Sequence, residues 1–520
     1  MNSMNETRGK DNRQAILAET AKLVERVEQA YVQGEAVHEL ERGLFAQLLR
    51  MGHQLVELFF SLCGPGDHGA QVSLPGGRQV KRLGRSRVRE YRSVFGEHQL
   101  ERVVYGTREG QKIDYVPLDS QRQLPASKFS YLLQEWDQAL VIEQPYAQVS
   151  ETLERMLGVR QSVHSLERIN QQLSGSVEAF WAGREPAPAA QDDELVVCSA
   201  DSKGVVRRRA VTAVDMVAER DVATTGDEGK PGGKKMALLG AAYPMAAYVR
   251  TPEQVLAALF TVPSASGTQP PRRPKPLHKY VRASLARDAQ ETMAPSYAAI
   301  FAWLAEEQRQ RNPSSQQRVV VLMDGQPSLW RAAEQGLAGV SYVEVLDLMH
   351  ALGYLWDAAE LFHPSGAQGP GTESVKQQRL VFVKQQAERL LNGQVQTVIG
   401  RLRAQSHRLS AAQRESLAEV IGYLSHNVAR MQYDHYLQAG YPIASGVIEG
   451  ACRHVVCDRM ERSGMRWVMP GAKAMLELRC IGINQDWEAF MKFHIAHENQ
   501  RLYPMKAAND ETFLPDRLIA

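Results

Sequence analysis

Two apolar runs, far apart in the chain, each end on a single aspartate. The run ELVVCSAD closes on Asp201, and the run RVVVLMDG places Asp324 directly after an unbroken apolar stretch. Continuous apolar runs of this length are typical of strands that are buried on both faces of a sheet. The distance between the two aspartates along the chain rules out a local loop, so bringing them together requires a large fold.

A third carboxylate, Glu449, lies in PIASGVIEGACRHVV, which reads as the opening of a helix. Alone, each residue has an ordinary explanation: many strands end on an aspartate, and a glutamate near a helix N-terminus is stabilised by the dipole. Together, two strand-end aspartates and one helical glutamate can converge on one point. Oxygen ligands of this kind suit Mg²⁺ or Mn²⁺. Paired ions in such a site catalyse in-line phosphoryl displacement.

Size and composition set only broad limits. The length of 520 residues allows two to four domains, and 44% hydrophobic residues are enough to build cores. The net charge of +2 does not by itself indicate a nucleic-acid partner. Three basic clusters, Arg207–Arg209, Lys234–Lys235 and Arg272–Lys275, flank the Asp201 segment. Singly each is typical of a solvated loop, whereas together they favour contact with a phosphate backbone.

The cysteines and the apolar runs indicate the compartment. Five cysteines, an odd number without a CxxC pair, argue against a disulfide framework. A zinc site is not supported either, since Cys452 and Cys457 lack a second pair. The N-terminus has no apolar signal region, and no stretch approaches 18 apolar residues. We therefore expect a soluble intracellular protein in a reducing compartment, without a membrane partner.

The N-terminal third is predicted to be mainly helical. Residues 13–62 have helical periodicity, and the alternating segment 93–119 predicts a β-hairpin about a polar turn. Residues 145–173 predict two helices, broken at Gly158 and resumed after a cap at Ser162. That pair is compatible with a DNA-binding helix-turn-helix, in which Arg160, His164, Arg168 and Asn170 would be exposed, and equally with an ordinary helical hairpin.

The rest of the chain changes character twice. A Pro/Ala linker at 182–193 precedes alternating strands and helices, which imply a mixed α/β layer fold. From 351 to 437 the periodicity is helical only, so this segment is predicted to be an all-helical insertion ahead of Glu449.

At this point the residues carry a family resemblance. The order Asp201, Asp324, Glu449, with a helical insertion before the glutamate, resembles DDE transposases of the RNase H-like superfamily. The amino-acid sequence more closely resembles that of bacterial insertion-sequence transposases of the ISKra group. The matching phrases span roughly residues 90–480 and include YVPLDSQRQLP, SADSKGV, VVVLMDGQPSLW, LDLMHALGYLW and GVIEGACRHVVCDRMERSGMRWVMPGAKAMLELR.

The resemblance implies an α/β RNase H-like catalytic domain with an all-helical insertion, and a mainly helical N-terminal DNA-binding region that contains the β-hairpin. The expected segments are 1–75 (N-terminal helices), 76–190 (hairpin and helix-turn-helix-like region), 191–348 and 441–495 (two parts of the catalytic domain), 349–440 (insertion) and 496–520 (tail). Asp201, Asp324 and Glu449 would be both the catalytic and the metal-binding residues, holding two Mg²⁺ ions for which Mn²⁺ substitutes.

Asp347 and His350 form a D-x-x-H pattern just after a predicted strand. The pattern is similar to one in transposases with helical insertions, which implies a supporting role: bracing the site or touching the scissile region. A buried Asp–His pair with a purely structural role explains the pattern equally well.

The segment after Glu449 carries candidate DNA-binding residues. Arg459, Arg462 and Arg466 have helical spacing and would share one face with Arg453 nearby, although Gly464 favours a break. Trp467 would stack on an unpaired base at a transposon end, or fill the core. In the N-terminal region, Arg160 and Arg168 are the corresponding candidates.

The resemblance as a whole implies a transposase that binds the inverted-repeat ends of an insertion sequence, cuts them, and joins them to target DNA. The expected partners are double-stranded transposon ends and target DNA, with the protein acting as a homo-oligomer on DNA in the bacterial cytoplasm, at the nucleoid. Two alternatives stay open: an RNase H-like nuclease without strand transfer, and a catalytically idle DNA-binding protein of the same fold.

Overall fold

A computed structural model of the chain describes residues 2–74, 77–110, 112–208, 233–260, 273–285, 294–364, 372–462 and 464–504. The chain divides into two compact units. Unit 1 consists of residues 1–182 with 486–520, and unit 2 is the intervening segment 183–485. The boundary at 182/183 falls at the start of the predicted Pro/Ala linker. The six finer segments expected from the sequence stay predictions.

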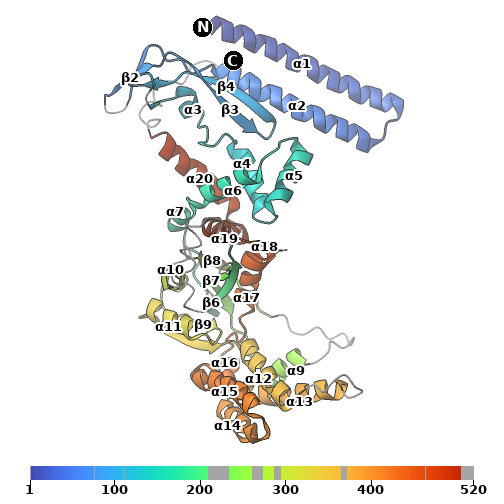
Figure 1. Ribbon diagram of the computed structural model, residues 1–520, viewed down its shortest axis with the longest axis vertical. Helices are drawn as coiled ribbons and strands as arrows, with labels where there is room; N and C mark the ends of the chain where they lie inside the picture. Colours follow the sequence, from blue (N-terminus) through green and yellow to red (C-terminus); the bar gives the residue numbers. More distant parts are fainter. Residues whose placement is uncertain are drawn as a thin grey trace. The chain divides into compact units, whose positions relative to one another are not determined.

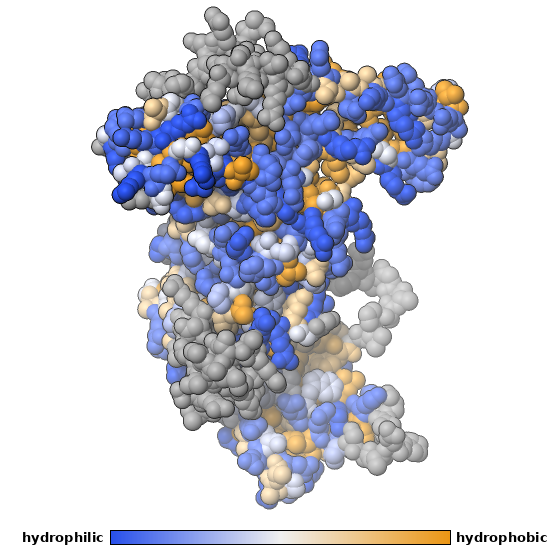
Figure 2. Space-filling model, turned by 45° about the horizontal axis from the view of Figure 1, so that its top comes forward, coloured by the Kyte–Doolittle hydropathy of each residue, from blue (hydrophilic) through white to orange (hydrophobic). Residues whose placement is uncertain are grey.

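Unit 1 begins with two long antiparallel helices, α1 (Asn2–Gln33) and α2 (Val37–Cys63). They confirm the helical prediction for 13–62, and Gly34 makes the turn between them at a φ of 65°. The pair exposes an unusual number of large apolar side chains, and Figure 2 shows such orange patches breaking the blue surface. The exposed side chains are Leu17, Val24, Val27, Tyr31, Val32, Val37, Phe45, Leu48, Leu55, Phe59 and Leu62.

Five short strands follow. The sheet β1-β2-β5 consists of β1 (Gln71–Ser73), β2 (Gln79–Arg82) and β5 (Tyr105–Gly106). A separate hairpin pairs β3 (Arg87–Ser93) with β4 (Gly96–Arg102). The predicted hairpin was therefore misplaced. The polar segment after Gly106, which was expected to be its turn, is spanned by a single β-bridge, Tyr105↔Tyr115. The observed hairpin turn lies earlier in the chain, between Ser93 and Gly96. Gly96 permits that turn because its φ of 120° is rare for other residues.

The helices of unit 1 that follow are short. They are α3 (Pro117–Gln121), α4 (Tyr131–Val141), α5 (Tyr146–Leu157), α6 (Val163–Ser174), α7 (Val177–Ala182) and, from the C-terminal end of the chain, α20 (Trp487–Leu502). The predicted pair of helices in 145–173 is confirmed as α5 and α6. Gly158 ends α5 in the left-handed conformation, and the Ser162 hydroxyl accepts a hydrogen bond from the Ser165 amide to cap α6.

Unit 2 is built on a five-stranded mixed sheet of order β10-β9-β6-β7-β8 (Figure 1). Its strands are β6 (Glu194–Val206), β7 (Lys234–Ala246), β8 (Tyr280–Leu285), β9 (Val319–Met323) and β10 (Tyr342–Leu346). β6, β9 and β10 run parallel, whereas β7 is antiparallel to both β6 and β8. The mixed α/β class predicted from the sequence is confirmed, while β8 was not predicted.

One strand prediction needs correction. Asp201 does not end its strand, because β6 continues to Val206 and stays paired with β7 as far as Val206↔Lys234. The apolar run stops at Asp201 because burial changes there: residues 194–200 are all buried, whereas residues 201–203 are only half-buried. The apolar run therefore indicated which residues of the strand are buried, and it did not indicate how far the strand remains hydrogen-bonded to its neighbour.

Helices cover both faces of this sheet (Figure 1). α10 (Ala294–Arg311) lies on one face, where a Cβ on Gly240 would meet Trp303. Ala200 pairs directly with Gly240 and shares its face, so the next residue, Asp201, points to the other side. There Cys452 of α17 (Gly446–Cys452) contacts the Asp201 carboxylate. α10 and α17 therefore lie on opposite faces.

The other helices of unit 2 outside the predicted insertion are α9 (Pro252–Phe260), α11 (Pro327–Gly336), α18 (Asp458–Met460) and α19 (Met469–Ile483). A π-helical turn (Arg453–Cys457) joins α17 to α18.

In the described residues of the segment between β10 and α17, all regular secondary structure is helical, which confirms the helical prediction for 351–437. It contains α12 (Leu348–Phe362), α13 (Thr372–Leu391), α14 (Val395–Gln405), α15 (Ala411–His426) and α16 (Tyr433–Gln438), with 3-10 turns at Ser406–Arg408 and Val428–Arg430. One continuous hydrophobic core joins these helices to the sheet: Val320 and Val345 of the strands pack in the same cluster as Leu355, Val398 and Leu417. The insertion is thus fused to the sheet.

Within the described parts of the chain, none of the helices combines the length and apolarity that a membrane crossing needs.

Candidate active site beside the central strands of unit 2

The register of the parallel strands brings three aspartates to one level. Leu346 of β10 pairs with Met323 of β9, and the Asp347 amide donates to the Met323 carbonyl oxygen at 2.8 Å, so Asp347 lies beside Asp324. On the other side of β9, Cys198 pairs with Val321, and Asp201 and Asp324 each follow that pair by three residues. The carboxylates of β6, β9 and β10 therefore line up across three neighbouring strands.

Asp201 is held against the helix that carries Glu449. Its Oδ1 accepts a hydrogen bond from the Ser202 amide at 2.6 Å, and its Oδ2 accepts one from the Cys452 thiol at 3.4 Å. Cys452 follows Glu449 by one helical turn, so both side chains lie on the same side of α17. The contact between Cys452 and Asp201 therefore brings Glu449 toward the aspartates.

Glu449 itself is oriented by two neighbours. The Ser445 hydroxyl donates to its Oε1 at 2.8 Å, and the His350 Nδ1 lies 3.9 Å from the same oxygen. One ligand atom each from Asp347, His350 and Glu449 lies within 4.8 Å of the others. Among the three aspartates, Glu449 thus lies near Asp347, which follows β10.

Asp347 connects three elements through a fully buried carboxylate. It caps α12 by accepting from the His350 amide at 2.9 Å, and it binds the His350 ring Nδ1 at 2.6 Å. Its other oxygen accepts from the Ser445 amide at 2.8 Å, at the residue that precedes α17. Burial acts to raise the pKa of Asp347, but these hydrogen bonds together outweigh it and lower the pKa.

The same hydrogen bond to Asp347 is the largest of the effects that raise the pKa of His350 to about 9. The ring is therefore a cation at neutral pH, close to Asp324, Asp347 and Glu449. It partly compensates the negative charge of the cluster.

Asp324 is half-buried and lies near two further carboxylates, those of Asp201 and Asp347. Burial raises its pKa, and the negative charges of Asp201 and Asp347 raise it further. A hydrogen bond from the Gln326 amide to Oδ1, 3.0 Å long, and the charge of His350 act in the opposite direction. A carboxylate that is buried among like charges gains most from a nearby cation.

A pocket of about 440 Å³ opens at Asp324. The insertion forms one wall, where Tyr354 of α12 and Tyr423 of α15 stack with ring centroids 3.8 Å apart. The pocket is lined by Asp324, Gly325, Gln326, Pro327, His350, Tyr354, Tyr423, His426 and Asn427. Both tyrosines therefore line the same pocket as Asp324.

Sequence reasoning missed four of the residues that shape this site: Tyr354, Tyr423, Ser445 and Cys452. For Cys452 a signal was present, since it follows Glu449 at i+3 and must share its helix face. Ser445 could have been noticed as a hydroxyl at the start of the same helix. The two tyrosines lie in helices whose packing against Asp324 only the folded chain defines.

The predicted arginine face after Glu449 is not formed. The helix ends at Met460, and Arg459 is fully buried with its guanidinium 5.2 Å from the ring centroid of Trp467. Trp467 is also buried, and its Nε1 donates to the Met460 carbonyl oxygen at 3.0 Å, so it fills the core. Both side chains pack inside unit 2 and are not exposed to DNA in this structure; for Trp467 this is the core position that the sequence had left open as an alternative.

The other three arginines of this segment remain at the surface: Arg453, Arg462 and Arg466 are exposed. Arg453 lies 3.7 Å from Asp458, and the Arg462 Nε donates to the Asp458 carbonyl oxygen. Their binding to DNA stays a prediction.

The basic clusters near Asp201 are only partly at the surface. Arg207 and Lys235 are buried, whereas Lys234 is exposed and lies 3.6 Å from Glu461. Arg209 and Arg272 lie outside the described residues. Arg208, Arg273 and Lys275 of the same clusters are exposed, so the contact of these clusters with a phosphate backbone stays a prediction.

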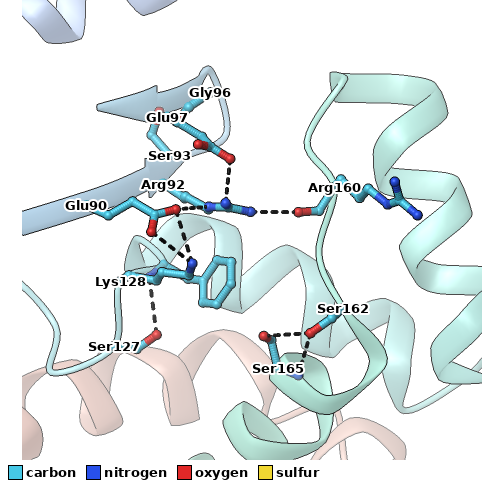
Figure 3. A network of polar contacts seen from close by, with 11 residues as sticks. Glu90, Arg92, Ser93, Gly96, Glu97, Ser127, Lys128, Arg160, Ser162 and Ser165 are labelled. Atoms are coloured by element: carbon cyan, nitrogen blue, oxygen red, sulfur yellow. Dashed lines mark hydrogen bonds and ion pairs between the residues drawn. The ribbon is translucent and has the colours of Figure 1, made fainter. Parts of the chain in front are cut away.

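In unit 1, Arg160, His164 and Arg168 are exposed as predicted. Asn170 is not: it is fully buried, and its Nδ2 donates to the Gln138 Oε1 at 3.0 Å. The turn before α6 is tied to the hairpin, since the Arg92 guanidinium donates to the Arg160 carbonyl oxygen at 2.9 Å (Figure 3).

Glu90 holds Arg92 at 2.6 Å, and the Arg160 guanidinium points away from this network (Figure 3). The side chain of Arg160 is thus free of the contacts that fix its backbone.

Comparisons with known proteins add little. No family model matches the chain, and no curated protein matches it. Among solved structures, the chain is similar to a Drosophila P element transposase strand transfer complex, with 9% sequence identity over 74% of this chain and 87% of that chain. The TM-score of 0.25 is too low to carry an argument about fold or function.

Proposed function

We propose that this protein is a DNA transposase of the DDE type, which binds the inverted-repeat ends of an insertion sequence and catalyses metal-dependent strand cleavage and strand transfer. Asp201, Asp324 and Glu449 are the catalytic and metal-binding residues. The partners are transposon-end DNA and target DNA, and the protein acts as a homo-oligomer on DNA, in the bacterial cytoplasm.

The observation that most supports the proposal is the alignment of acidic residues across the parallel strands. Asp201 and Asp324 follow the β6–β9 pair Cys198↔Val321 at equal distance, and Glu449 approaches from α17. These residues come from segments far apart in the chain, and the strand register and the contact between Cys452 and Asp201 set them on neighbouring elements of unit 2. The described sheet, in which β7 runs antiparallel to the other four strands, is compatible with an RNase H-like fold.

The donor set fits Mg²⁺ or Mn²⁺, since the three proposed ligands offer only carboxylate oxygens. The raised pKa of Asp324, caused by burial and by neighbouring negative charge, points the same way, because a bound cation relieves that repulsion. Of two such ions, one would activate water or a DNA 3′-hydroxyl as the nucleophile, and the other would stabilise the leaving oxygen.

The protein's own contribution is positioning. Asp347 holds the Ser445 amide, the Ser445 hydroxyl fixes one oxygen of Glu449, and the Cys452 thiol fixes one oxygen of Asp201. We assign Asp347 and His350 to this supporting role, since both Asp347 oxygens are already engaged in hydrogen bonds. Tyr354 and Tyr423 form the wall of the pocket at Asp324 on the insertion side.

The test uses the full-length chain, Mg²⁺ and labelled DNA that carries the element's ends with flanking sequence. Asp324→Asn keeps the shape of the side chain and removes the charge. We expect cleavage to fall by orders of magnitude while the mobility shift of end DNA is retained. Asp357→Asn, an exposed carboxylate in α12, is the matched control and should cleave normally. Equal cleavage by Asp324→Asn and wild type would refute the assignment.

The same reaction separates the alternatives. Products in which the labelled end is covalently joined to a second duplex require strand transfer, and their absence beside efficient cleavage would identify a nuclease of the same fold. End binding by the wild-type chain without cleavage in Mg²⁺ or Mn²⁺ would identify a catalytically idle DNA-binding protein.

A further inference from the structure

Three metal-ligating side chains converge in unit 1, in the part of the molecule that the proposed chemistry does not use. His53 and Glu57 are four residues apart on α2, so they lie on the same face of that helix. His98 comes from β4 of the hairpin packed against α2. One ligand atom from each of the three lies within 4.8 Å of the others.

The contacts within this cluster already orient the donor atoms. The His98 Nδ1 lies 2.6 Å from the Glu57 Oε1, and the His53 ring stacks on the His98 ring with centroids 4.4 Å apart. Glu57 therefore lies at the Nδ1 edge of the buried histidine ring, and His53 covers one face of the same ring.

Ser93 provides what a metal-bound histidine needs at its second nitrogen. The His98 Nε2 lies 3.0 Å from the Ser93 Oγ, which also accepts the Phe95 amide at 3.0 Å. Histidines that bind metals usually donate their other ring N–H to such a partner, which fixes the tautomer and the ring. In the tautomer whose Nε2–H donates to Ser93, the Nδ1 lone pair points at Glu57, and a cation there would take the place of the proton that the other tautomer carries.

The backbone is shaped to the cluster as well. Gly96 makes the hairpin turn, and a Cβ there would lie 3.2 Å from the His53 Nδ1. The hairpin thus closes directly on the histidine. On the opposite side the cluster is open, because the Glu57 side chain is 41% exposed and His53 is half-buried. An ion can enter from solvent, and a water molecule can complete its coordination.

We propose that His53, Glu57 and His98 bind one zinc-type transition-metal ion, which clamps α2 to the β3–β4 hairpin. Two imidazoles and one carboxylate favour Zn²⁺ over Mg²⁺, and three protein ligands plus water make a tetrahedral site. Zn–N distances of about 2.0–2.1 Å place tetrahedral donor atoms about 3.3 Å apart. To reach that spacing, the His53 ring must rotate out of its stack on His98 so that one of its nitrogens points at the ion. The site is independent of the catalytic carboxylates, which lie in unit 2.

The experiment is a titration of the chelator-treated full-length protein with Co²⁺, followed by displacement with Zn²⁺. Tetrahedral Co²⁺ with histidine ligands absorbs strongly in the visible range, whereas octahedral Co²⁺ on carboxylates absorbs weakly. We expect one equivalent of strongly absorbing Co²⁺, lost in His53→Ala and unchanged in His38→Ala, an exposed histidine on the same helix. Ser93→Ala should weaken binding about 10–100-fold.

Three further results decide the proposal. Asp324→Asn should bind Co²⁺ as the wild type does, which separates this site from the proposed catalytic one. Thermal unfolding of the wild type should move to higher temperature with Zn²⁺, and that of His53→Ala should not. Absence of the strong band in the folded wild-type protein, or its persistence in His53→Ala, would overturn the proposal and leave a hydrogen-bonded structural histidine.

Discussion

Gly325 follows Asp324 at the point where the helical insertion touches the catalytic sheet, and replacing it with alanine tests that contact. A Cβ at this position would lie 2.2 Å from Cε2 and 2.6 Å from Cζ of Tyr423. Ordinary carbon contacts are about 3.5–4.0 Å, so the ring must move by more than an ångström. Its stacking on Tyr354 resists that movement.

Overpacking of this kind typically costs about 1–3 kcal/mol, and we expect Gly325→Ala to lower the free energy of unfolding by that amount. The backbone conformation adds no penalty, because the φ of Gly325 lies outside the left-handed region. In a Tyr423→Ala background the clash disappears. In that background the same substitution should be neutral or should raise the free energy of unfolding by about 0.4–1 kcal/mol, because alanine gives the unfolded chain less conformational freedom than glycine does.

The assay is a double-mutant cycle in urea, with unfolding followed by tryptophan fluorescence at constant m-value. Gly353→Ala is the matched control: it lies in α12, and its added Cβ meets nothing within 4 Å. It should stabilise the protein by about 0.5–1 kcal/mol. A loss of stability at Gly325 that is equal in both backgrounds would show that Tyr423 does not press on this loop, and the described wall of the pocket would be wrong.

Three further predictions concern other parts of the molecule. Asp347→Ala leaves the Ser445 amide and the first turn of α12 without their acceptor, and should cost about 2–4 kcal/mol in urea unfolding, whereas Asp347→Asn should cost less. Burial lowers the pKa of His494 to about 4, whereas a histidine of the unfolded chain has an ordinary pKa near 6.5, so the unfolded chain takes up the proton first as the pH falls. The free energy of unfolding should therefore decrease by up to about 3 kcal/mol between pH 6.5 and pH 4. His494→Gln should make the free energy of unfolding less dependent on pH in this range. Arg168→Ala should weaken binding of end DNA and reduce the salt dependence of log K by about 1, while Arg155→Ala on α5 should not; equal salt slopes for both variants would move end recognition elsewhere.

Several elements could be predicted from the sequence because their signals are local. The stripe of α5, the cap at Ser162 and the left-handed Gly158 all act within a few residues, and the structure has them as expected. The buried strand that precedes Asp324 and the change to helices after β10 were equally visible, since apolar periodicity records which face of an element meets a core. For the same reason Asp201 and Asp324 stand out as candidates in the amino-acid sequence alone.

The tertiary structure decided what depends on partners distant in the chain. Arg459 and Trp467 have the composition of a DNA-binding surface, but they are buried because α18 ends at Met460 and the chain folds back over them. β8 forms because β7 offers a free edge, not because its own sequence announces a strand.

The alignment of the aspartates is also a tertiary property. The sequence by itself determined which carboxylates follow apolar strands. The parallel register of β6, β9 and β10 decided that Asp347 stands level with Asp324, and the packing of α17 decided that Cys452 and Ser445 orient Asp201 and Glu449. The physical reason is that strand pairing and helix docking are set by the fit of whole faces, whereas propensity and capping act within a few residues of one another.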